Sequence, residues 1–152
     1  MLRPSWSCDP ISGNGAKRNG GRFNQIGTQA LYLSEQFETA VTEYLQESDR
    51  PGTLCPYHLE IKKVVDLTSK EVLLSLGINE ELLYSDWRES KTHETWNLST
   101  RLILLGVKGA IFSSVQRKGG KNLVLWNWND LDVKVFDPRS DLPKDDLSWR
   151  KS

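Results

Sequence analysis

Sulfur-containing residues are scarce in this 152-residue chain, which has two cysteines, Cys8 and Cys55, and a single methionine at its first position. Two widely separated thiols without metal-ligand spacing are typical of reduced cysteines and not of a disulfide scaffold. We therefore predict free thiols and a cytoplasmic protein. The six tryptophans, by contrast, supply rigid aromatic side chains for a core.

Long apolar runs and an excess of one charge are also missing. No stretch approaches the 18 apolar residues that a membrane-spanning helix needs, and no apolar segment follows Met1 as it would in a secretory signal. The chain has 20 basic and 20 acidic residues. A balanced chain lacks the positive excess of a direct nucleic-acid binder and the polybasic segment of a membrane-attached protein, so we predict neither.

Signals for metal or nucleophile chemistry are weak. The histidines His58 and His93 and the two cysteines have no zinc-type spacing, so we predict no metal site. The chain has no G-x-S-x-G elbow. Residues 13–21 are rich in glycine, but we expect no strand before them and no helix directly after them. The expected surroundings of these glycines therefore exclude a Rossmann or phosphate-binding loop, which needs a strand before it and a helix after it.

The length predicts one domain over residues 1–152, and the patterning predicts an α+β fold. The first 30 residues are expected to form an ordered loop without helix. Apolar patterning predicts strands at 30–33, 57–61, 110–112, 122–128 and 133–136, with 64–65 extending or pairing beside 57–61, and helices at 36–46, 68–76, 79–83 and 95–105. Because both faces of 122–128 carry apolar residues, we expect this strand to be central.

The helix at 36–46 carries a candidate functional carboxylate. We expect its apolar positions to pack on the core and Ser34 to cap its N-terminus. Glu43 lies at the border of that apolar face, where a carboxylate points either into a cleft or into solvent. The apolar positions are Phe37, Ala40, Val41, Tyr44 and Leu45.

Charge is unevenly distributed along the chain. Residues 1–33 carry four cationic side chains and one acidic one, residues 34–49 carry five acidic side chains and no cationic one, and residues 107–121 carry four cationic side chains and no acidic one. If these segments meet in the fold, they form an anion-binding cleft with a carboxylate inside.

An ordered set of short motifs runs through the chain. The central motifs are GGRFNQIGTQALYL at 20–33 and ETAVTE at 38–43. Further motifs are SGNGA at 12–16, DW at 86–87, GVKGAIFSS at 106–114, NLVLW at 122–126, DP at 137–138, LP at 142–143 and SW at 148–149. This ordered set resembles the RES-domain family, the toxins of bacterial type II toxin–antitoxin pairs with Xre-like antitoxins, although relatives commonly have proline where this chain has Ser113.

The resemblance implies an ADP-ribosyltransferase-like fold, in which two small, mainly antiparallel sheets with flanking helices form a cleft for NAD. The site residues that it implies are Arg22, Tyr32, Glu43 and Ser114, with Asn122 as a further substrate-binding candidate. Glu43 would stabilise the positive charge that develops on the ribose, Arg22 would hold the pyrophosphate or a group beside the nicotinamide, and Tyr32 would face the nicotinamide ring.

Three functions follow from the resemblance. The first is an NAD-degrading toxin that cleaves the nicotinamide–ribose bond, as a glycohydrolase if water attacks and as a phosphorylase if phosphate attacks. The second is mono-ADP-ribosyl transfer to a cellular protein, and the third is a non-catalytic interaction module. The resemblance also implies neutralisation by an Xre-like helix-turn-helix antitoxin, with DNA bound only through that partner.

Overall fold

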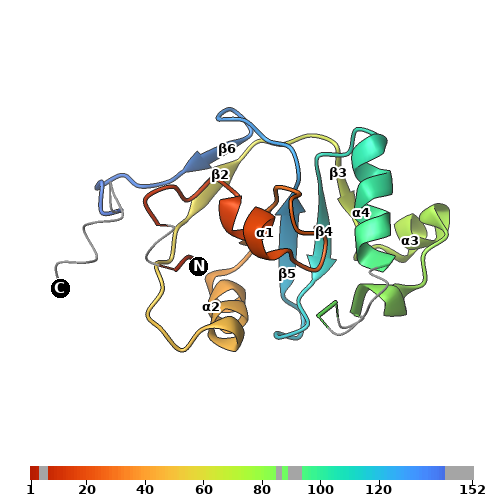
Figure 1. Ribbon diagram of the computed structural model, residues 1–152, viewed down its shortest axis with the longest axis horizontal. Coiled ribbons are helices and arrows are strands. Elements are labelled where there is room, and N and C mark those ends of the chain that lie inside the picture. Colours follow the sequence, from red (N-terminus) through yellow and green to blue (C-terminus); the bar gives the residue numbers. More distant parts are fainter. Residues whose placement is uncertain (4–6, 85–86, 89–93, 143–152) are drawn as a thin grey trace.

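The computed structural model describes residues 1–3, 7–84, 87–88 and 94–142. It confirms a mixed α+β fold with two small sheets and flanking helices (Figure 1). In chain order the elements are α1 (Asn14–Asn19), β1 (Leu31–Ser34), α2 (Phe37–Glu47), β2 (Tyr57–Leu59), β3 (Val64–Asp66), α3 (Lys70–Leu76), the 3-10 helix η2 (Glu80–Tyr84), α4 (Glu94–Leu104), β4 (Gly109–Ser113), β5 (Lys121–Leu125) and β6 (Val133–Val135).

The larger sheet has the strand order β1-β5-β4-β3. Its β1–β5 and β4–β5 pairs are antiparallel, as is the separate pair β2–β6. The expectation that residues 64–65 join 57–61 was wrong, because β3 pairs in parallel with β4 and Val64 lies opposite Gly109. The helices α3, η2 and α4 lie between β3 and β4 in the sequence and supply the long crossover that a parallel pair requires.

β5 is the central strand, as predicted, with β1 on one side and β4 on the other. It ends at Leu125 and not at residue 128. Val124 packs in one apolar cluster and Leu125 in another, because successive side chains of a strand point to opposite faces. The sheet is therefore covered on both faces.

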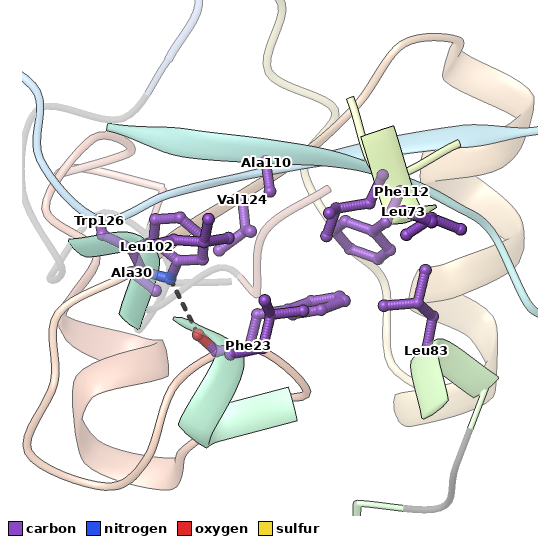
Figure 2. Packing of buried hydrophobic residues seen from close by; sticks show 11 residues of the cluster. Phe23, Ala30, Leu73, Leu83, Leu102, Ala110, Phe112, Val124 and Trp126 are labelled. Carbon is purple, nitrogen blue, oxygen red and sulfur yellow. Dashed lines mark hydrogen bonds between the residues drawn. The ribbon is translucent and has the colours of Figure 1, made fainter. Parts of the chain in front are cut away.

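The larger apolar cluster lies between one face of the four-stranded sheet and the helical side of the molecule (Figure 2). Phe112 and Val124 belong to the sheet, whereas Leu73 comes from α3, Leu83 from η2 and Leu102 from α4. Figure 1 shows α3 and α4 beside the β3 edge and the pair β2–β6 at the opposite end of the molecule. The smaller cluster joins Leu31 and Leu125 to Val133 of β6.

One expectation about α2 was wrong, and a second holds only in part, since Ala40 is buried but other apolar positions are exposed. Its N-cap residue is Gln36, and Ser34 is the last residue of β1. Phe37 and Leu45 are 61% and 63% exposed, whereas the buried residues of the helix are Thr39 and Ala40. The face of α2 that packs on the protein is therefore partly polar, which apolar periodicity does not reveal.

The other helices agree more closely with the prediction. α3 is capped by Ser69 and closed by Gly77, which has a left-handed conformation with φ of 67°. The structure also contains α1, which was not expected, in the N-terminal segment. Gly13 and Gly20, with φ of 63° and 72°, bound this six-residue helix. In the described residues, no helix has the length and apolar character required to cross a bilayer.

Candidate active site

One face of the four-stranded sheet changes from apolar to polar along its strands. Tyr32 and Ser34 are two residues apart on β1 and therefore share a face. Asn122 of β5 pairs with Ser34 of β1 on one side and with Phe112 of β4 on the other. Ser114 follows β4 at the same end of the sheet. This register brings three polar side chains to the end of a face that otherwise belongs to the larger core.

Glu43 of α2 completes this polar group. Its Oε1 accepts a hydrogen bond from Oγ of Ser114 and another from Nδ2 of Asn122, each over 2.7 Å. Ser114 and Asn122 are only 8% and 7% exposed, whereas Glu43 is half-buried. Oγ of Ser34 donates in turn to Oδ1 of Asn122 over 2.7 Å. The carboxylate is thus fixed by neutral donors, with part of it open to solvent.

The loop after β4 holds the Ser114 hydroxyl in place. Its Oγ accepts from the backbone N–H groups of Gln116 and Arg117 over 3.2 and 3.0 Å. The guanidinium of Arg117 reaches back to α2, where it donates to Oε1 of Gln36 and to Oγ1 of Thr39. A Cβ on Gly120 would lie 2.7 Å from Oγ1 of Thr39. Glycine at this position therefore lets the loop close against α2.

Tyr32 and Arg22 form a second group beside this one. The Tyr32 hydroxyl donates to Oδ1 of Asn24 and accepts from the backbone N–H of Phe23, each over 2.9 Å. Burial raises the pKa of Tyr32 well above its usual range, and the Phe23 hydrogen bond and the charge of Arg22 oppose this only in part. The hydroxyl therefore stays protonated and is directed into the protein, which leaves the ring as the part able to face a ligand.

Side chains from the helical side and from the end of β5 fix the backbone around Arg22. The carbonyls of three successive residues accept hydrogen bonds: Gly21 from Nε1 of Trp96, Arg22 from Oγ1 of Thr95, and Phe23 from Nε1 of Trp126. Figure 2 shows the Trp126 indole aimed at the Phe23 carbonyl. The Arg22 guanidinium itself donates to the carbonyl of Leu83 over 3.0 Å. The N-terminal segment is thus held by a buried tryptophan, Trp126, and a half-buried one, Trp96, and Arg22 has a defined position.

The five residues named from the sequence thus fall into two groups, which are linked by the sheet face that Tyr32 shares with Asn122. Glu43, Ser114 and Asn122 are in direct contact, whereas Arg22 and Tyr32 lie together next to them. The sequence did not single out Thr39 or Asn24 for this region, and it suggested Ser34 only as a helix cap. The alternation of β1 carried a usable signal for Ser34, because a residue two positions after Tyr32 must share its face.

Other motif positions contribute less or lie elsewhere. Asp86 and the closing motif residues from Pro143 onward are outside the described residues. In the part of the chain that the structure describes, no group of three or more potential metal ligands gathers, and Cys8 and Cys55 are free thiols. A hollow of about 390 Å³ lies between Thr53 and the segment 136–142, and none of the five site residues lines it.

Comparison with known families agrees with the motif pattern. The family model for the RES domain matches residues 1–149, and the chain belongs to the RES domain family. Among curated proteins, the chain is similar to the NAD(+) phosphorylase MbcT of Mycobacterium bovis and of two Mycobacterium tuberculosis strains, with 25% identity over 118 residues in each case. The aligned part is 68% of this chain and 63% of each relative, so the chain spans less than two thirds of the relatives' length.

Proposed function

We propose that this protein is an NAD-degrading toxin that cleaves the bond between nicotinamide and ribose and transfers the ADP-ribosyl group to phosphate. The observation that carries the proposal is the half-buried carboxylate of Glu43, fixed through one oxygen by Ser114 and Asn122. The similarity to proteins named NAD(+) phosphorylase supports phosphate as the acceptor.

The chemistry suits a fixed carboxylate. When the bond between the ribose carbon and the pyridinium nitrogen breaks, the electron pair goes to the nitrogen and nicotinamide leaves as a neutral molecule. Positive charge then develops on the ribose, as in glycoside cleavage. Glu43 stabilises this charge and binds the ribose hydroxyls, and its fixed position avoids the cost of reorienting during the reaction.

The acceptor completes the balance of atoms. An oxygen of inorganic phosphate forms the new bond to the ribose carbon, and the products are nicotinamide and ADP-ribose carrying a phosphate on that carbon. If the attacking phosphate oxygen carries a proton, that proton is released to solvent when the new bond forms. Attack by water at the same carbon would instead give free ADP-ribose and a proton.

Arg22 and Tyr32 serve binding in this proposal. The guanidinium of Arg22 suits the NAD pyrophosphate or a group beside the nicotinamide, because its planar fork matches such oxygens. The ring of Tyr32 offers a flat surface to the nicotinamide, while its hydroxyl is occupied by Asn24 and Phe23. Tyr32 shares a sheet face with Asn122 of the Glu43 group, and the charge of Arg22 acts on Tyr32, which supports one continuous site.

The remaining parts of the proposal concern fold and partners. We propose that residues 1–152 form one RES domain with an ADP-ribosyltransferase-like cleft for NAD, and that it acts in the cytoplasm. An Xre-like helix-turn-helix antitoxin neutralises it, and DNA is bound only through that partner. The equal numbers of acidic and basic residues support this last point. Tight operator binding by the isolated chain would contradict it.

Product analysis tests the proposed activity. Purified protein is incubated with NAD, with and without inorganic phosphate, and products are identified by mass spectrometry and phosphorus NMR. We expect nicotinamide and a phosphorylated ADP-ribose that forms only with phosphate. Free ADP-ribose in both samples would replace the phosphorylase by a glycohydrolase, and ADP-ribose attached to a protein would replace it by a transferase. Unchanged NAD in all samples would refute NAD degradation.

A further inference from the structure

The Asn122 amide is held by a hydrogen bond at each of its two ends. An asparagine side chain presents a carbonyl at one position and an NH2 group at the other, and rotating it by half a turn exchanges them. Oδ1 of Asn122 accepts from Ser34, and Nδ2 donates to Glu43. A serine hydroxyl donates only one hydrogen, so the Ser34 contact uses it fully.

We propose that Ser34 is a positioning residue for the reaction, which rests on the proposed function. Its hydroxyl holds the carbonyl of Asn122 so that the NH2 group faces the carboxylate of Glu43. Without that donor, Oδ1 of Asn122 loses its partner, and the amide is held at one end only, by the hydrogen bond from Nδ2 to Oε1 of Glu43. Because Asn122 is only 7% exposed, water has little access to compensate.

The second donor to Glu43 is fixed in the same way. Oγ of Ser114 accepts from the N–H groups of Gln116 and Arg117, which occupy its two acceptor positions. Its single hydrogen is therefore left for Oε1 of Glu43. Ser114 and Asn122 both donate to Oε1 of Glu43, so its two acceptor positions are occupied. In this proposal Oε2 is therefore the carboxylate oxygen that contacts the ribose.

Ser34 thus ends a continuous chain of hydrogen bonds that runs from β1 through β5 to α2. Each step is 2.7 Å long, from Ser34 to Asn122 and from Asn122 to Glu43. Ser34 contacts the carboxylate only through Asn122 in this chain. Its effect on turnover must therefore depend on the presence of Asn122, which distinguishes positioning from a general contribution to stability.

Steady-state kinetics tests this dependence. We expect Ser34→Ala to lower kcat for NAD loss about tenfold with KM for NAD within about twofold, which corresponds to one lost hydrogen bond in the transition state. Ser34→Thr, which keeps the hydroxyl, should recover kcat to within about threefold of wild type. Ser113→Ala is the matched control, because Ser113 is a half-buried serine of the same sheet whose side chain points to the opposite face.

A double-mutant cycle then separates the two roles. In an Asn122→Ala background, Ser34→Ala should change kcat by less than about twofold, because the group through which it acts is absent. An equal loss in both backgrounds, or no loss from Ser34→Ala in an active wild type, would overturn the positioning role and leave the proposed function standing.

A readout without turnover keeps the inference testable if the protein consumes no NAD. In nitrogen-15-labelled protein, the side-chain amide signals of Asn122 are identified by their loss in Asn122→Ala. We expect these signals to shift in Ser34→Ala and not in Ser113→Ala. Signals that stay unchanged in Ser34→Ala would refute the hydrogen-bond chain, whereas shifted signals with an inactive wild type would refute only the proposed function.

Discussion

At the scale of single residues, the Tyr32 hydroxyl has a structural task. It satisfies the Phe23 N–H and Oδ1 of Asn24, and Asn24 is 1% exposed with its amide bonded to the carbonyls of Ala16 and Thr28. A Cβ on Gly21 would lie 2.7 Å from both the Asn24 and Tyr32 oxygens. The segment around Arg22 is therefore closed around this hydroxyl.

Replacement of Tyr32 by phenylalanine tests that task. We expect Tyr32→Phe to lower the free energy of unfolding by about 1–3 kcal/mol, because two buried polar partners lose their hydrogen bond while the ring is kept. Urea denaturation measures the loss. Tyr84→Phe is the control, because Tyr84 is 43% exposed and should change stability little. A large loss of turnover at unchanged stability would instead place the hydroxyl in the chemistry.

The same hydroxyl gives a pH dependence. Burial raises the pKa of Tyr32 in the folded state above the ordinary value of 10.0. Above that pH the unfolded chain releases the tyrosine proton and the folded chain keeps it, so the contribution of Tyr32 to the free energy of unfolding is fully present below about pH 10 and falls as the pH rises further. Tyr57 has a pKa raised by burial as well and adds to this fall. The slope above pH 10 should be shallower in Tyr32→Phe.

The family pattern named residues that lie together in the structure, and their part in a reaction stays a prediction. Glu43, Ser114 and Asn122 were named from the family pattern, and the structure places them in contact. Ser34 was assigned to a helix cap because serine is a common cap, although its strand position decides its contact. Asn24 was missed because nothing local shows that an asparagine in a loop will be buried.

At the scale of elements, α2 and the loop after β4 act as a pair. Thr39 and Glu43, four residues apart on one face of α2, each contact this loop, through Arg117 and Ser114 respectively. The sequence predicted the helix correctly, since its apolar residues recur at helical spacing. It predicted the burial of Ala40 but not that of Thr39, because the loop and the strand ends supply polar partners that compensate for burying Thr39.

Arg117 is the residue that ties this pair together. We expect Arg117→Ala to lower kcat about three- to tenfold, because the loop that aims the Ser114 hydroxyl loses its side-chain contacts with Gln36 and Thr39. NAD turnover measures the effect, and Lys118→Ala, at an exposed position in the same loop, is the control. Equal turnover in Arg117→Ala and wild type would show that the loop backbone alone holds Ser114.

At the scale of the whole molecule, the fold brings part of the basic segment 107–121 against the acidic segment 34–49. The late basic segment meets the acidic helix through Arg117, and a second cation, Arg88, pairs with Glu47 of α2 over 2.8 Å. Lys108 does not join them, because it pairs with Asp132 over 2.7 Å at the other end of β4. The charge distribution along the sequence thus indicated correctly that cationic side chains contact α2. It also included Lys108, which pairs with Asp132 and not with α2.

The parallel strand β3 shows the limit of local patterns at this scale. Val64 and Val65 have strand character, but nothing in them states which partner they take. The pairing with β4 follows from the helices between them and from their packing on Phe112 and Val124. Long-range pairing of this kind depends on the assembled core.

The central claim is that Glu43 carries the cleavage of NAD. The most direct measurement is nicotinamide release from NAD in phosphate buffer by wild type, by Glu43→Gln and by Glu38→Gln, an exposed carboxylate on the same helix. We predict a loss of at least about a hundredfold in Glu43→Gln, wild-type rates in Glu38→Gln, and the same unfolding temperature within a few degrees for all three. Wild-type nicotinamide release by a folded Glu43→Gln protein would contradict the account.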